Sequence, residues 1–169
     1  MFPGKDTKLK IFSNRVIQEG PFDINLIYKN MKEWFDNHKY TYSELENTTS
    51  FKPKGAEIKL KMRGEKEVTE YYKFTITVAF LILETEKVKI DGRVMDSGKL
   101  EARIDVFLDL DYRKKFEKTK MAKFVRFLYH NYVIKKQIAS EYGGKAYGDG
   151  MGMFDTIKDT IGLYTENTE

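Results

Sequence analysis

Apolar and polar side chains alternate along several consecutive segments between residues 56 and 111, and this alternation restricts the possible folds more than any other sequence feature. In the last segment, 99–111, every second residue is apolar and all but one of the residues between them are charged. Side chains of a β-strand point alternately to its two faces, so each segment is expected to bury one face and expose the other. Short turns connect the segments, whereas parallel strands would require long crossovers. The sequence therefore predicts an antiparallel sheet.

The alternation and the β-branched and aromatic composition predict a long-stranded, twisted antiparallel sheet of about five to six strands. The expected strands are 8–17, 40–51, 56–63, 68–83, 88–94 and 99–111, with turns at 52–55, 64–65, 84–86 and 96–98. The strand 68–83 differs from the others because Ala79, Leu81 and Leu83 replace the polar residues of its second face. We therefore expect the far end of this strand to be covered on both sides.

Two segments have helical rather than alternating spacing. Asp23 can cap a helix, and apolar residues recur at helical spacing from 24 to 37. Trp34 is expected to anchor this helix on the sheet, because so large an aromatic residue dominates local burial. The second pattern, 113–142, is long enough at ~1.5 Å per residue to cross the sheet. The chain is thus expected to have an α+β fold, with one N-terminal helix and a long C-terminal helix packed on one face.

A chain of 169 residues is expected to form a single domain, 1–169. Within it, residues 1–7 are expected to be flexible and residues 165–169 to form a frayed tail. The glycine-rich segment 143–152 matches no phosphate-binding loop motif and is predicted to be a connector. It leads to a short amphipathic helix at 153–163.

The order of elements, namely a strand, a helix, several antiparallel strands and a long C-terminal helix, resembles the helix-grip fold of the START and plant-allergen superfamily over about residues 8–142. The resemblance implies a sheet wrapped around the long helix and a cavity that holds an apolar ligand. Polar residues at 120, 131 and 135 interrupt the apolar arc of that helix. Either the lysine stems reach the sheet edge, or these groups meet the polar end of a ligand. The residues expected to line such a cavity are Lys120, Asn131, Lys135, Phe124, Leu128, Ala79 and Leu81.

The polar side of the same helix is strongly basic. The segment 113–142 carries nine Lys or Arg residues and two Glu residues. Such a face can dock to nucleic acid or to an anionic membrane. The alternative is a solvated face balanced by the acidic C-terminal segment. The residues expected to contact an anionic partner are Lys115, Lys118, Lys123, Arg126 and Lys136.

Side chains that usually carry catalysis are scarce. The chain has no cysteine and two histidines, so disulfides, thiolate nucleophiles and cysteine metal sites are excluded. His38 falls at the end of the first predicted helix, where its ring can interact with the last carbonyl groups. Asp109 and Asp111 share a predicted strand face with Asp105 and are candidates for a Mg²⁺ site, although alternating charges on a solvated face explain them without metal. We expect no catalytic residue and no cofactor.

The N-terminal segment lacks the apolar core of a signal peptide, and no uncharged run approaches the ~20 residues of a membrane helix. We therefore expect an intracellular, cytoplasmic protein without a transmembrane segment. The leading hypothesis is a non-enzymatic binding or interaction protein, in which an apolar surface between the sheet and the long helix takes a small hydrophobic ligand or a partner segment. The alternatives are docking to nucleic acid or an anionic membrane through 113–136, and a structural role in a larger, oligomeric assembly.

Overall fold

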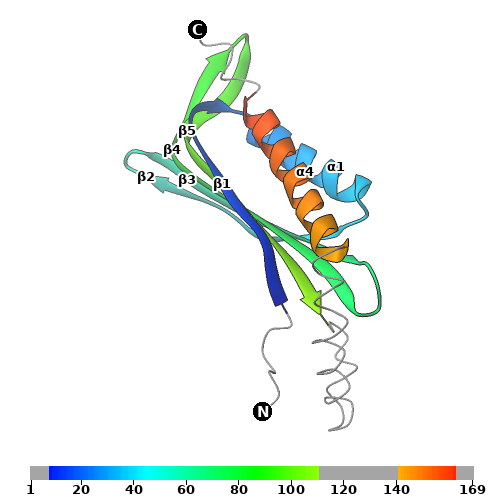
Figure 1. Cartoon of the computed structure of the whole chain (residues 1–169). Coiled ribbons are helices and arrows are strands. Elements are labelled where there is room, and N and C mark those ends of the chain that lie inside the picture. Colours follow the sequence, from blue (N-terminus) through cyan, green and yellow to red (C-terminus); the bar gives the residue numbers. More distant parts are fainter. Residues whose placement is uncertain (1–7, 111–140, 163–169) are drawn as a thin grey trace.

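The structure is a computed structural model, which describes residues 8–110 and 141–162. Within these residues, five strands form one antiparallel sheet in the order β1-β5-β4-β3-β2, and two helices accompany it (Figure 1). The elements are β1 (Lys8–Phe22), α1 (Ile24–Asn37), β2 (Thr41–Lys52), β3 (Gly55–Glu67), β4 (Tyr72–Ile90), β5 (Arg93–Leu110) and α4 (Gly143–Gly162). The predicted α+β class and the antiparallel sheet are confirmed.

The helix α1 begins and ends where its sequence predicts. The Asp23 carboxylate accepts hydrogen bonds from the backbone N–H groups of Asn25 and Leu26, which would otherwise lack partners at the helix start. At the other end, His38 donates from Nδ1 to the Trp34 carbonyl oxygen at 2.8 Å. The His38 ring also stacks on the Trp34 indole, with 3.9 Å between ring centroids. The expected structural role of His38 at the helix end is confirmed.

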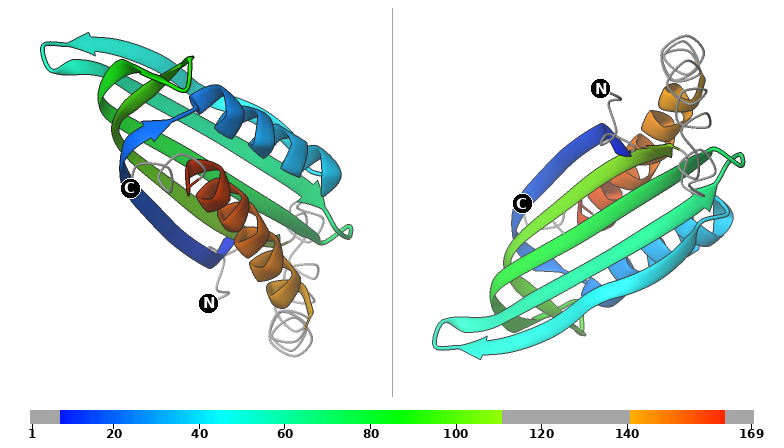
Figure 2. Two further views of the ribbon diagram at one scale, coloured as in Figure 1. Left: turned by 90° about the horizontal axis from the view of Figure 1, so that it is seen from above. Right: turned by 90° about the horizontal axis from the view of Figure 1, so that it is seen from below.

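Both helices pack on the same face of the sheet, with α4 over β1 and β5 and α1 beside it (Figure 2). Trp34 lies between the helices, and its indole Nε1 would be 3.5 Å from a Cβ added at Gly152 of α4. Tyr40 donates a hydrogen bond of 2.7 Å to Asp149 and so joins the start of β2 to α4. The face of β4 toward the helices is buried as predicted, with every side chain at most 2% exposed: Tyr72, Phe74, Ile76, Val78, Phe80 and Ile82.

The turn expected at Gly64-Glu65 is not present, because β3 continues through Gly64 to Glu67. Gly64 pairs with Ile76 of β4, on the face that the helices cover. A Cβ at this position would lie 2.2 Å from Cε1 of Phe35, so no larger residue fits beneath the Phe35 ring. This glycine serves the close approach of α1 to the sheet and not a turn.

The turns expected at 84–86 and 96–98 also lie inside strands. A bulge between Leu83 and Glu86 lets β4 continue, and residues 96–98 pair with β1. The chain reverses instead at Asp91-Gly92, where φ is 47° and 78°, as a two-residue hairpin turn requires. The three strands expected at 68–83, 88–94 and 99–111 are therefore two long strands, β4 and β5.

The pairing of β4 with both neighbouring strands is interrupted at the β4 bulge, and this region is here called the crease. Gly98 of β5 faces the bulge, where an added Cβ would lie 2.7 Å from the Leu83 carbonyl oxygen. Gly98 also pairs with Gly20 of β1, so neither strand carries a side chain at this point. Beyond the crease, the β4–β5 hairpin diverges from the β2–β3 hairpin (Figure 1).

The segment 143–152, expected to be a connector, forms the first half of α4, and the helix continues through most of the predicted helix 153–163. It is helical because one side of it is buried, as Ala146 and Gly150 show. An added Cβ at Gly150 would lie 2.7 Å from Cγ2 of Val106. Tertiary packing thus outweighs the low helix propensity of glycine, about 1 kcal/mol per residue. The predicted helix 113–142 lies almost wholly outside the described residues, as do 1–7 and 165–169.

Candidate interaction surface on the open face of the sheet

One face of the sheet, here called the open face, points away from α1 and α4, and no described element covers it (Figure 2). In β5, the side chains that reach this face alternate with buried ones over the whole second half of the strand. The predicted alternation of 99–110 is therefore confirmed, with the apolar phase toward the helices. The strand register then determines which open-face side chains lie next to one another.

An apolar strip, composed of Ala79, Leu81 and Leu83 of β4, runs along the centre of the open face. These side chains are half-buried, and among the described residues the neighbouring strands shield them; the expected cover over this end of the strand stays a prediction. Lys59, for example, is the register partner of Leu81, and its aliphatic stem can lie along the strip. Ile17 of β1 adds to the apolar area of this face, with 61% of its surface exposed.

Basic side chains flank the apolar strip. One row crosses four strands from Lys61 through Ala79 and Arg103 to Arg15. Lys59 and Arg63 lie two residues to either side of Lys61 on the same face of β3. We call the five basic residues the basic frame: Arg15, Lys59, Lys61, Arg63 and Arg103.

Two carboxylates lie within the basic frame and are already engaged. Asp105 accepts a hydrogen bond of 2.7 Å from the Ser13 hydroxyl and lies 3.2 Å from Lys10 Nζ and 3.4 Å from Arg103 Nε. Partial burial raises the pKa of Asp105. The Ser13 hydrogen bond and the two cations lower it by a larger amount, so the pKa lies below its usual value. Glu101 lies 4.0 Å from Arg15. Glu57 and Glu65 likewise pair with Lys59 and Arg63, at 3.3 and 4.0 Å, so Lys61 is the member of the basic frame without an ion pair among the described residues.

The described residues offer few ligands for the predicted cation site. The Thr75 hydroxyl donates a 2.5 Å hydrogen bond to Asp109, and Asp111 lies outside the described ranges. Among residues 8–110 and 141–162, no group of three or more His, Asp or Glu side chains is placed to hold a metal ion. Magnesium binding at these aspartates therefore stays a prediction.

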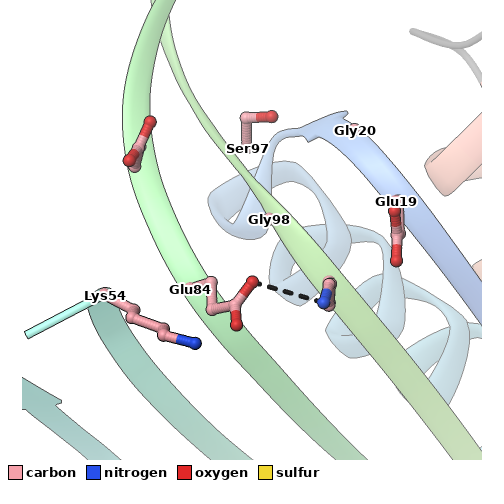
Figure 3. A pocket seen from close by; sticks show the side chains of 8 residues that line it. Glu19, Gly20, Lys54, Glu84, Ser97 and Gly98 are labelled. Carbon is pink, nitrogen blue, oxygen red and sulfur yellow. Dashed lines mark ion pairs between the residues drawn. The ribbon is translucent and has the colours of Figure 1, made fainter. Parts of the chain in front are cut away.

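A shallow pocket of about 330 Å³ opens at the crease (Figure 3). Glu84 and Lys99 form an ion pair of 3.3 Å in it, and Glu19 and Lys54 line it from neighbouring segments. The lining side chains are polar and of both charges, so the pocket lacks the apolar walls that a hydrophobic ligand needs.

The structure places two of the predicted cavity residues, Ala79 and Leu81, on the open face and therefore not between the sheet and the described helices. The other cavity candidates lie outside the described residues: Lys120, Phe124, Leu128, Asn131 and Lys135. The same holds for the predicted anionic-partner residues Lys115, Lys118, Lys123, Arg126 and Lys136. The cavity and the basic helix remain predictions.

Sequence reasoning did not identify the basic frame, although each of its residues stands in a predicted strand. The signal in the sequence was the polar phase of the alternation in 56–63 and 99–111. That phase indicates which side chains share a face but not which strands are neighbours. Only the pairing of β3, β4, β5 and β1 brings Lys61, Arg103 and Arg15 into one row.

No family model matches the chain, and a search of curated proteins finds no match. Neither described helix combines the length and the apolar character needed to cross a membrane.

Proposed function

We propose that the chain is a non-enzymatic interaction protein that binds a segment of a partner protein on its open face. The observation that carries this proposal is the apolar strip at the centre of a sheet face that no described element covers. Ile17, on the same face, has 61% of its surface exposed. Apolar side chains gathered at the centre of a polar face are typical of protein interfaces.

The contacts that potentially reactive side chains make within the fold support binding over catalysis. His38 is stacked on Trp34 and bonded to its carbonyl group. Asp105 is held by Ser13 and two basic side chains, and Tyr40 is buried and bonded to Asp149. A general base needs access to substrate, and these contacts occupy the described candidates.

The competing form of the proposal is a small hydrophobic ligand held between the sheet and the segment 113–142, as the helix-grip resemblance implies. Of that order of elements, the structure describes the first strand, α1 and the antiparallel strands, whereas the long helix expected at 113–142 lies almost wholly outside the described residues. The described interior favours the partner segment instead, because Gly64 and Gly150 let α1 and α4 approach the sheet until side chains fill the space. Docking through 113–136 and membership of a larger assembly are further outcomes that the experiment distinguishes.

The experiment compares two matched substitutions, Ile17→Glu and Val94→Glu. Both residues are β-branched and exposed, at 61% and 69%, but Val94 lies near the Asp91-Gly92 turn, away from the centre of the open face. The protein and each variant are purified gently from the cells that make them and examined by native mass spectrometry. We expect Ile17→Glu to release the partner, while Val94→Glu retains it.

Each other outcome contradicts the proposal in a specific way. A partner that survives Ile17→Glu with unchanged stoichiometry places the contact elsewhere, such as on 113–136. A monomer that carries a small apolar molecule favours the cavity. A thermal unfolding scan of both variants checks that release does not result from unfolding.

A further inference from the structure

We propose that the partner segment is an acidic amphipathic helix, which lies along β4 with its apolar side on the apolar strip and its carboxylates against the basic frame. This inference rests on the proposed function and adds the chemical class of the partner. The argument depends on the size of the side chains, on the charges that surround them and on the symmetry of the face.

The side chains at the centre of the open face are shorter than the lysine and arginine side chains beside them. Thr77, Ala79 and Leu81 follow one another on β4, with Lys61 on one side and Arg103 on the other. Neighbouring strands lie ~4.8 Å apart, so the two flanking strands are separated by ~10 Å. An α-helix with its side chains is ~10 Å wide, so it can rest on these residues with the basic row of β3 on one side and, on β5, Arg103 between Glu101 and Asp105 on the other.

The charges of the face favour an acidic partner. The carboxylates of Asp105 and Glu101 already have basic partners at 3.2–4.0 Å. Lys61 has no ion pair among the described residues and is exposed. A helix with carboxylates along both edges of an apolar stripe would therefore meet the unpaired Lys61 on the β3 side, and on the β5 side Lys10 and Arg103, which share the single carboxylate of Asp105.

A second copy of the chain fits this face poorly. In a two-fold symmetric contact centred on Ala79, each basic frame would lie against the other frame. Lys61 and Arg103 of one copy would then oppose the same residues of the second copy, and like charges in direct opposition are destabilising.

Single-stranded nucleic acid also fits poorly, because its bases bind by stacking on exposed aromatic rings. The apolar strip is aliphatic. Phe107, the aromatic residue nearest to it in register on β5, has Lys8 and Lys10 over its ring, at 4.6 and 5.5 Å from the centroid.

The test uses two synthetic amphipathic peptides that share one leucine stripe and differ in their flanking residues, glutamate in one and lysine in the other. Binding to the full chain is measured by fluorescence anisotropy at low and moderate salt. We expect the glutamate peptide to bind at least about tenfold more tightly at low salt, with the difference falling as salt screens the charges.

The charge-reversed variant Lys61→Glu/Arg103→Glu is expected to lose this preference. Lys29→Glu/Lys158→Glu changes the net charge equally on the exposed sides of α1 and α4, and it is expected to retain the preference. Thermal unfolding of both variants confirms folding before binding is compared.

Three results would overturn the inference. They are equal binding of the two peptides, an equal loss in both variants, and a single-stranded oligonucleotide that displaces the glutamate peptide from the basic frame. If either peptide result occurs while Ile17→Glu still releases the cellular partner, the acidic helix is wrong and the proposed function stands. If Ile17→Glu releases nothing, the proposed function itself fails.

Discussion

Asp105 shows how a single residue can join two strands on a face that is open to solvent. It bonds Ser13 and Lys10 on β1 while it sits on β5 beside Arg103. Its own side chain is 19% exposed, so these contacts are less screened than those of a fully exposed pair. The three contacts all favour the ionised carboxylate, and they therefore stabilise the fold only while Asp105 carries its charge.

Asp105→Asn should therefore change the pH dependence of folding. The pKa of Asp105 is lowered in the folded state, so its stabilisation is complete above its unfolded pKa of about 3.9 and is lost as pH falls through the folded value. We expect the variant to be less stable by about 1 kcal/mol at pH 7 and the difference to vanish in stronger acid. Urea unfolding at several pH values measures this, with Asp159→Asn on α4 as control. A difference that persists unchanged at pH 2 would contradict the argument.

At the level of elements, the alternation in the sequence predicts which face of a strand is buried better than it predicts where the strand ends. The apolar phases of 68–83 and 99–111 are the buried faces of β4 and β5, because the period of two is a property of each strand alone. The predictions of turns at 64–65, 84–86 and 96–98 were wrong, because these segments pair with neighbouring strands and their glycine and acidic residues do not reverse the chain. Gly64 accommodates Phe35 of α1, and no local pattern in β3 contains that information.

Gly64→Ala tests whether the contact between α1 and β3 requires glycine. The new Cβ would overlap the Phe35 ring, so we expect a loss of about 1–3 kcal/mol in the free energy of unfolding. Gly148→Ala is the matched control, since no atom lies within 4 Å of its added Cβ and alanine favours the helix α4. The control should gain up to about 1 kcal/mol. Loss of stability in both variants, measured by urea unfolding, would refute the close-approach argument.

At the level of the whole molecule, the side chains of the two sheet faces follow from different causes. The helix-facing side holds the core, and the sequence predicted most of that core because it follows from periodicity. The open face acquires its character from register, which places residues from four strands in one row. Since register depends on bulges such as that between Lys10 and Phe12, reading single segments could not locate the basic frame.

The same asymmetry predicts how the molecule opens locally. β4 has a paired neighbour on each side and a buried face, whereas β2 is an edge strand whose side chains are exposed along nearly its whole length. The start of β2 is held by α1, because Tyr28 donates to Glu44 at 2.7 Å and Tyr42 stacks on Phe35. Residues 46–52 lack such support from either described helix.

We therefore expect amide hydrogen exchange to be slowest in residues 72–83 of β4 and at least about a hundredfold faster in residues 46–52 of β2. Within β2, residues 41–44 should exchange more slowly than 46–52, which separates the effect of α1 from that of the edge position. Uniform protection along β2 would mean that the edge is covered, and the partner would then have to be sought at β2 and not over β4. Addition of the glutamate peptide should slow exchange in β3, β4 and β5 next to the basic frame and leave 46–52 unchanged, since a helix on the apolar strip does not reach the outer half of β2.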